Sequence, residues 1–128
     1  MIPFQVLNLD HVVLRVADVA RACRFYCDVL GCCEERRAES IGLVQLRAGA
    51  SLIDLVPADP PAAGGGNMDH FALRIEPFEE AALRAHLSAA GLDVGQVVTR
   101  YGAEGSGPSI YIEDPDGNVV ELKGAAED

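Results

Sequence analysis

The chain has 128 residues and a mass of 13.6 kDa, and 49% of its residues are hydrophobic. This length and apolar content suffice for one folded domain with a core, and they exclude a mainly disordered chain. Twenty acidic against ten basic residues give a net charge of −10, which argues against binding to nucleic acid or to an anionic membrane.

The chain is expected to be soluble and cytoplasmic. The first residues lack the basic and apolar pattern of a secretory signal. No uninterrupted apolar run reaches the length of about 18 residues that a membrane-spanning helix needs.

The first predicted element is a strand at residues 9–16, where apolar and polar residues alternate. Its apolar side would pack beneath a helix, which leaves His11 and Arg15 on the opposite face. A helix follows through Leu30, with Asp18 as its cap and Gly31 as its stop.

Four cysteines gather around the end of this helix: Cys23, Cys27, Cys32 and Cys33. A disulfide framework would spread its cysteines along the chain, and a structural zinc site would have paired cysteines with two residues between them. We therefore predict buried thiols that act as small hydrophobic residues.

Three further strands are predicted in the first half, at residues 33–37, 42–47 and 51–56. The last two flank the short turn at residues 48–50. Alternation in the third of these strands puts Asp54 on the face away from the helix. Residues 59–67, rich in proline, alanine and glycine, read as a linker.

The second half repeats the first. The strand pattern of residues 9–16 returns at 68–75, 59 residues later, with His70 and Arg74 facing away from the helix. The next helix is expected to have Pro77 in its first turn and Gly91 as its stop.

The remaining strands are predicted at residues 94–100, 109–113 and 119–123. Residues 102–108 read as a flexible loop. The sequence from Asp114 to Asn118 has the proline and glycine of a tight turn. Glu121 then lies on the same kind of face as Asp54.

The predicted fold is α+β. Two βαβββ modules form a curved, barrel-like mixed sheet with helices on its outer face, within a single domain of residues 1–128. Module one covers about residues 6–58 and module two about residues 68–123.

Four side chains with metal-binding chemistry fall on the non-helical face: His11, Asp54, His70 and Glu121. Two imidazoles and one or two carboxylates suit a divalent ion such as Zn, Ni, Mn, Fe or Co. Such a site leaves room for a substrate oxygen, and a carboxylate beside the ion can move a proton. A single strand histidine would be an ordinary hydrogen-bonded residue, but the same placement occurs in both modules.

The paired modules, their opening histidines and the run from Asp114 through Gly117 to Glu121 resemble the vicinal oxygen chelate superfamily. The resemblance covers about residues 6–123. That group includes glyoxalase I, fosfomycin-resistance thiol transferases, extradiol dioxygenases, methylmalonyl-CoA epimerases and bleomycin-binding proteins. The resemblance implies a small-molecule substrate and a homodimer.

The resemblance also implies roles for single residues. His11 and His70 match metal ligands, and Glu121 matches a glutamate that binds the metal and carries a proton. Asp54 stands in place of a longer glutamate, so it is either a ligand or a nearby base. Arg15 matches an arginine that holds a substrate carboxylate.

Three residues complete the predicted substrate site. Ser109 and Tyr111 resemble a substrate loop of the fosfomycin enzymes, and Arg74 lies on the cleft face.

Three functions stay open at this point. The first is a metal-dependent lyase or isomerase of glyoxalase type, with Glu121 and Asp54 as catalytic residues. The second is a thiol transferase or extradiol-type dioxygenase that uses the two histidines and Glu121. The third is a metal-free protein that binds a cationic drug.

Overall fold

A computed structural model of the protein describes residues 5–58, 68 and 70–127. The chain divides into two compact units, residues 1–63 and 64–128, each with its own four-stranded sheet. The predicted linker at residues 59–67 lies outside the described residues, and so does Asp69 of the repeat.

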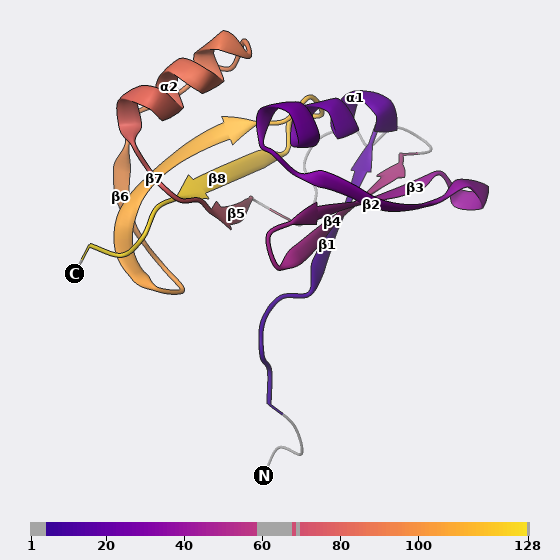
Figure 1. The fold of residues 1–128 in the computed structure, drawn as a ribbon, viewed down its shortest axis with the longest axis horizontal. Helices are drawn as coiled ribbons and strands as arrows, with labels where there is room; N and C mark the ends of the chain where they lie inside the picture. Colours follow the sequence, from indigo (N-terminus) through magenta and orange to yellow (C-terminus); the bar gives the residue numbers. More distant parts are fainter. Residues whose placement is uncertain (1–4, 59–67, 69, 128) are drawn as a thin grey trace. The chain divides into compact units, whose positions relative to one another are not determined.

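Unit 1 has the element order expected of a βαβββ module (Figure 1). Its elements are β1 (His11–Val16), α1 (Val19–Arg24), the π-helical turn η1 (Phe25–Val29), β2 (Cys33–Ala38), the 3-10 turn η2 (Glu39–Ile41), β3 (Leu43–Ala48) and β4 (Ser51–Pro57). The sheet order is β1-β4-β3-β2, with β1 parallel to β4 and the other pairs antiparallel.

Unit 2 repeats this topology. Its elements are β5 (Phe71–Arg74), α2 (Glu80–Ala89), β6 (Val98–Gly102), β7 (Gly105–Glu113) and β8 (Val119–Lys123). The sheet order is β5-β8-β7-β6, with β5 parallel to β8. The α+β class and the paired modules are therefore confirmed, and each sheet is open rather than closed into a barrel.

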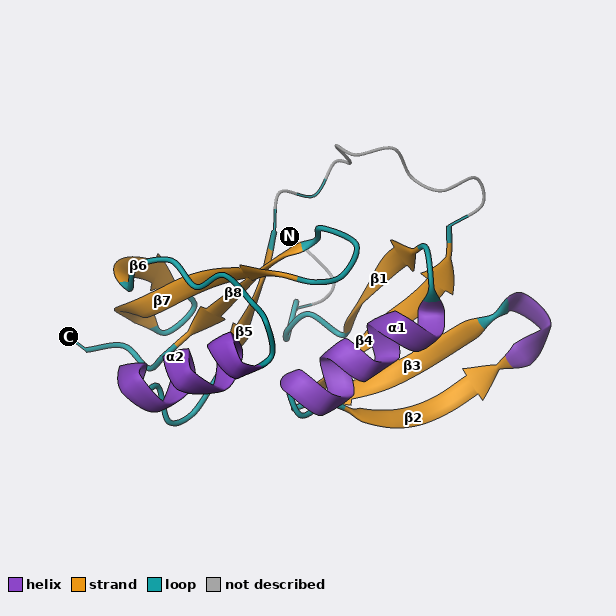
Figure 2. Ribbon diagram, turned by 90° about the horizontal axis from the view of Figure 1, so that it is seen from above, coloured by secondary structure: helices purple, strands orange, loops and turns teal. Residues whose placement is uncertain are grey.

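The core of unit 1 lies between the sheet and α1, which crosses one face of it (Figure 2). Leu14 and Val16 of β1 are buried as the alternation predicts, while His11 and Arg15 are exposed. Burying each large aliphatic side chain contributes about 1.5–3 kcal/mol, so this face fixes which residues of the strands point the other way. The core side chains of this unit are Leu14, Val16, Ala22, Phe25, Tyr26, Cys32, Val44, Leu46, Ile53 and Leu55. Of the four thiols predicted to be buried, Cys32 is buried and Cys23 and Cys27 are half-buried, but the prediction is wrong for Cys33, which is exposed.

The core of unit 2 is built by the equivalent positions. Ile110, Ile112, Val120 and Leu122 of the sheet are at most 2% exposed, and Leu87 of α2 is fully buried. Residues between these positions point to the opposite face, and they carry most of the polar chemistry of the unit.

The helix starts and stops follow the expected pattern with one exception. Asp18 caps α1 and accepts a hydrogen bond from the Arg21 backbone N–H at 3.0 Å. The placement of Pro77 in the first turn of α2 is wrong. That helix begins at Glu80, because Glu79 supplies the cap and accepts from the Ala82 backbone N–H at 3.0 Å.

Two predictions in the second half are corrected. Residues 94–97 are not a strand, since the Val94 carbonyl accepts a hydrogen bond from Arg84 of α2 at 3.1 Å rather than from a neighbouring strand. The predicted loop at 102–108 is a hairpin in which Gly102 pairs with Gly105. The sequence did not predict these strands because the glycines of this segment have no side chains that could show an alternation of apolar and polar residues.

Candidate functional site

In unit 2 the predicted pair of His70 and Glu121 comes together. Glu121 lies on β8 and is 6% exposed, and its Oε1 is 3.2 Å from Nε2 of His70, just before β5. The other carboxylate oxygen, Oε2, accepts a hydrogen bond from the Ser109 hydroxyl at 2.8 Å. Because Ser109 holds Oε2, Oε1 stays directed toward the imidazole.

Arg100 and Tyr111 extend this pair into a network. Arg100 of β6 donates to the Ser109 hydroxyl at 3.0 Å and to its backbone carbonyl at 3.3 Å. The Arg100 guanidinium also lies over the Tyr111 ring, 4.1 Å from its centroid. The Tyr111 ring meets His70 edge-on with centroids 5.1 Å apart, so each of these groups restricts its neighbour.

In unit 1 His11 stands at the start of β1 with a partner that orients it. Its Nδ1 is 2.8 Å from a carboxylate oxygen of Asp10. This hydrogen bond is the main cause that raises the pKa of His11 above its usual 6.5, and the nearby charge of Asp54 adds to it. A carboxylate on one ring nitrogen is the usual support of a metal-binding histidine and leaves Nε2 for the ion.

Asp54 of β4 is buried at 5% exposure and has a hydrogen-bond donor of its own. The Gln45 amide nitrogen lies 3.1 Å from each of the two carboxylate oxygens. The amide oxygen of Gln45 in turn accepts from Arg36 at 3.0 Å. Both oxygens of Asp54 are therefore shared with one donor, unlike those of Glu121.

The two units thus carry equivalent hydrogen-bond chains across three strands. Each begins with an arginine (Arg36 or Arg100), continues through a neutral polar residue and ends on a buried carboxylate. Sequence reasoning missed Arg36, Gln45 and Arg100. The repeat could have suggested them, but only the register between strands shows which side chains meet.

The predicted substrate-binding arginines differ in their surroundings. Arg15 lies exposed on β1. Arg74 of β5 is engaged, since its Nε is 2.9 Å from Glu104 and it donates to the Ile75 carbonyl as well.

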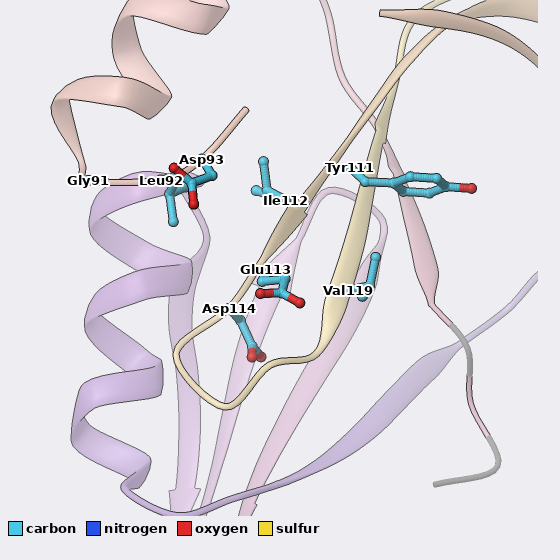
Figure 3. A pocket seen from close by; sticks show the side chains of 8 residues that line it. All are labelled: Gly91, Leu92, Asp93, Tyr111, Ile112, Glu113, Asp114 and Val119. Carbon is cyan, nitrogen blue, oxygen red and sulfur yellow. The ribbon is translucent and has the colours of Figure 1, made fainter. Parts of the chain in front are cut away.

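A pocket with a cavity volume of about 490 Å³ opens beside Tyr111 in unit 2 (Figure 3). Its wall combines apolar side chains with three carboxylates, of which Asp114 is held by the backbone N–H groups of its own turn. The lining residues are Gly91, Leu92, Asp93, Tyr111, Ile112, Glu113, Asp114 and Val119.

Each unit carries one imidazole and one buried carboxylate of the four predicted metal ligands. Within the residues that the structure describes, no three histidine, cysteine, aspartate or glutamate side chains form a metal-binding group. The oriented His11, the Glu121 oxygen directed at His70 and the low exposure of both carboxylates fit the nitrogen and oxygen ligands that divalent ions prefer.

A family model described as the glyoxalase/bleomycin resistance protein/dioxygenase superfamily matches residues 8–122. The chain belongs to this superfamily. The match spans both modules, since it begins before β1 and ends within β8. It includes all four predicted ligands.

Relatives within the superfamily include the virulence protein STM3117 of Salmonella typhimurium. It is 31% identical over 122 residues, which cover 90% of this chain and 82% of the relative. Its crystal structure superposes with a TM-score of 0.77, covering 96% of this chain and 100% of that chain.

Two more distant structures share the fold. The fosfomycin resistance protein FosX of Listeria monocytogenes is 21% identical with a TM-score of 0.74, covering 96% of this chain and 97% of FosX. A lactoylglutathione lyase of Agrobacterium tumefaciens is 22% identical with a TM-score of 0.68, covering 91% of this chain and 92% of the lyase. In the described part of the chain, no helix is long and apolar enough to cross a membrane.

Proposed function

We propose that the chain is a divalent-metal-dependent enzyme of glyoxalase type, a lyase or isomerase that acts on a small substrate through a chelating oxygen. One observation carries the proposal. The buried Glu121 has one oxygen 3.2 Å from His70 and the other engaged by Ser109, which is an arrangement suited to a metal ligand. His11, with its Nδ1 on Asp10, is proposed as the third ligand.

The ion would polarise a substrate oxygen and so make the neighbouring C–H bond more acidic. Proton transfer then falls to the chain's own carboxylates. Oε1 of Glu121 or an oxygen of Asp54 takes the proton from that carbon and returns it to the adjacent atom, which isomerises the substrate. A positioned base of this kind contributes about 10²–10⁴-fold to the rate.

A fosfomycin-type addition is the second candidate. It is favoured by the gathering of Arg100, Ser109 and Tyr111 beside Glu121, since a guanidinium and hydroxyl groups suit an anionic substrate. The homodimer and the cytoplasmic location stay predictions.

Metal content of the purified protein tests the first proposal. After reconstitution, elemental analysis is expected to find about one divalent ion per chain, with Zn or Ni favouring glyoxalase chemistry and Mn or Fe the transferase or dioxygenase. Replacing His11, His70 or Glu121 by Ala should lower occupancy at least tenfold. His86 on α2 is the remaining histidine of the chain, so His86→Ala is the matched control. A reconstituted protein without stoichiometric metal would overturn the proposal and favour the metal-free binding protein.

Asp54→Asn, measured in the same titration, separates the two roles of this carboxylate. Because the Gln45 amide donates hydrogen bonds to both oxygens of Asp54, we expect Asp54 to act as a base rather than as a metal ligand. The variant should then keep its metal within about twofold and lose turnover on any identified substrate by about 10²-fold or more. A tenfold weaker affinity for metal would instead make Asp54 a ligand.

A further inference from the structure

Lys123 is the only lysine of the chain, and it is buried. It is 7% exposed, whereas ammonium groups normally stay in water. It lies on β8 two residues after Glu121, so both side chains leave the same face of the sheet. This face therefore carries a buried cation in a protein of net charge −10.

The bonding of this ammonium is incomplete. Among the described residues, its one hydrogen bond runs to the Gly124 carbonyl at 3.4 Å, and no carboxylate of those residues lies within ion-pair distance. An ammonium has three donors, and burying it without an anionic partner is costly. A group in this condition suits an anion that arrives with a ligand.

Two glycines make room for the lysine side chain. A Cβ at Gly102 would lie 2.9 Å from Cε of Lys123, and a Cβ at Gly107 would lie 3.2 Å from its Nζ. The side chain thus runs diagonally from β8 across β7 toward the turn between β6 and β7. A side chain at Gly102 would displace Lys123, whereas one at Gly107 would first meet the backbone carbonyl of Ala125.

An ion pair crosses the sheet over the same strands. Arg74 of β5 pairs in register with Lys123, and its Nε is 2.9 Å from Glu104 in the turn between β6 and β7. Because β8 and β7 lie between β5 and β6, the link from Arg74 to Glu104 spans the strand that carries Lys123. Arg74 is therefore a second cation near Lys123, beside Arg100 of β6, and it is held by Glu104 through Nε and by Glu76 at 3.3 Å from Nη2.

We propose that Lys123 and Arg74 form an oxyanion subsite that binds a carboxylate or phosphate group of the ligand. The anion takes the open donors of Lys123 and replaces Glu104 on Arg74. The inference goes beyond the proposed function because it assigns an anionic group to the ligand. It rests on unit 2 alone and needs no metal.

The single lysine makes a direct test possible. Protein labelled with ¹³C at the lysine ε-carbon gives one signal, which is followed by NMR in chelator-treated protein during titration with sodium acetate or inorganic phosphate. We expect a saturable shift with at least one of the two anions, and the stronger one identifies the group. Sodium chloride at equal ionic strength should leave the signal in place.

Variants test the roles of Lys123 and Glu104. Because Lys123→Met removes the lysine signal, anion binding is followed here by the NMR signal of the Gly107 backbone amide, which lies beside Lys123. Lys123→Met should weaken anion binding at least tenfold. Glu104→Gln keeps Lys123 and Arg74 and removes the carboxylate that competes for Nε of Arg74, so it should tighten binding about threefold or more. This variant keeps the test valid if Lys123→Met fails to fold. Arg24→Met removes one exposed positive charge from α1 and should change nothing.

A Lys123 signal that does not move with either anion, or that moves equally with chloride, would overturn the subsite. Unchanged or weaker binding by Glu104→Gln would overturn the competition for Arg74. Failure of the metal proposal would show as absent metal in the separate reconstitution, since this titration is carried out without metal.

Discussion

Each carboxylate of the proposed site is fixed by a neutral donor that an arginine orients. Ser109 donates to only one oxygen of Glu121, whereas the Gln45 amide is shared between both oxygens of Asp54. Charge-assisted hydrogen bonds of this kind hold a side chain in one orientation, and their loss leaves a buried charge unsupported. Glu121 therefore has one oxygen without a bond to its strand neighbour Ser109 and available to a metal, whereas both oxygens of Asp54 accept from Gln45.

The neighbouring thiols Cys32 and Cys33 are predicted to differ in reactivity. Burial is the main cause that raises the pKa of Cys32 to about 11, while Cys33 is exposed. At pH 8 about one Cys32 thiol in a thousand is therefore ionised, and iodoacetamide should modify Cys33 at least tenfold faster. Tandem mass spectrometry of the alkylated peptide measures both rates.

The same shift in pKa predicts a dependence of stability on pH. The folded protein keeps its Cys32 proton to higher pH than the unfolded chain does, so the stabilisation from this thiol is present below about pH 9 and is lost as the pH rises toward 11. A Cys32→Ala variant is the control, because its unfolding free energy should decline less. Burial also raises the pKa of Cys23 and of Cys27, so these two thiols keep part of the decline. Equal alkylation of both cysteines in the native protein would contradict the predicted difference in reactivity, and an equal decline in Cys32→Ala would contradict the predicted pH dependence.

The sequence could identify the residues of the site that the pleat alone positions. His11, Asp54, His70 and Glu121 follow from alternation within single strands. In the structure Asp54 pairs in register with Gln45, and Glu121 pairs with Tyr111. Residues whose role depends on a neighbouring strand were not predictable in this way. Arg100 reaches Ser109, and Lys123 lies over Gly107, only because of the register between β6, β7 and β8.

At the scale of elements, both modules end their helices in the same way. Gly31 and Gly91 have φ values of +81° and +83°, and their backbone N–H groups bond back to the carbonyls of Cys27 and Ser88. This left-handed conformation is open to glycine and costly for other residues. Helix ends were predictable because this glycine signal is local. The prediction of a strand at 94–97 was wrong because its backbone bonds instead to Arg84 of α2, ten residues away from Val94.

Gly31→Ala and Gly91→Ala are expected to destabilise their units to a similar extent. No atom lies within 4 Å of a Cβ built at either position, so the cost is conformational and amounts to about 1 kcal/mol each. Urea unfolding followed by circular dichroism measures it. Gly95→Ala is the matched control, since Gly95 has equal space around it without a positive φ. A loss at Gly95 as large as at Gly31 would show that the backbone conformation is not the cause.

At the scale of the whole molecule, the chain consists of two modules with the same topology. Each module has a sheet with one largely apolar face and one face that carries polar side chains. Each sheet has an edge strand, β1 in unit 1 and β5 in unit 2, that begins its module. Such edges and uncovered apolar residues are usually protected by another chain or by charge. The net charge of −10 opposes unspecific association, so a partner has to fit specifically.

The chain is predicted to form a homodimer through the segment that leads into β1. Val6, Leu7 and Leu9 are between 78% and 82% exposed, and this apolar run continues directly into the edge strand β1. A second copy would cover both features, which a symmetric interface achieves at once. Sedimentation at roughly micromolar concentration should therefore give twice the 13.6 kDa of the chain.

Leu7→Asp together with Leu9→Asp should produce the monomer, because the charges would be buried in the interface. Ile41→Asp, at another apolar residue with 63% exposure, should leave the dimer intact, whereas a 13.6 kDa species of the unaltered protein would refute the prediction.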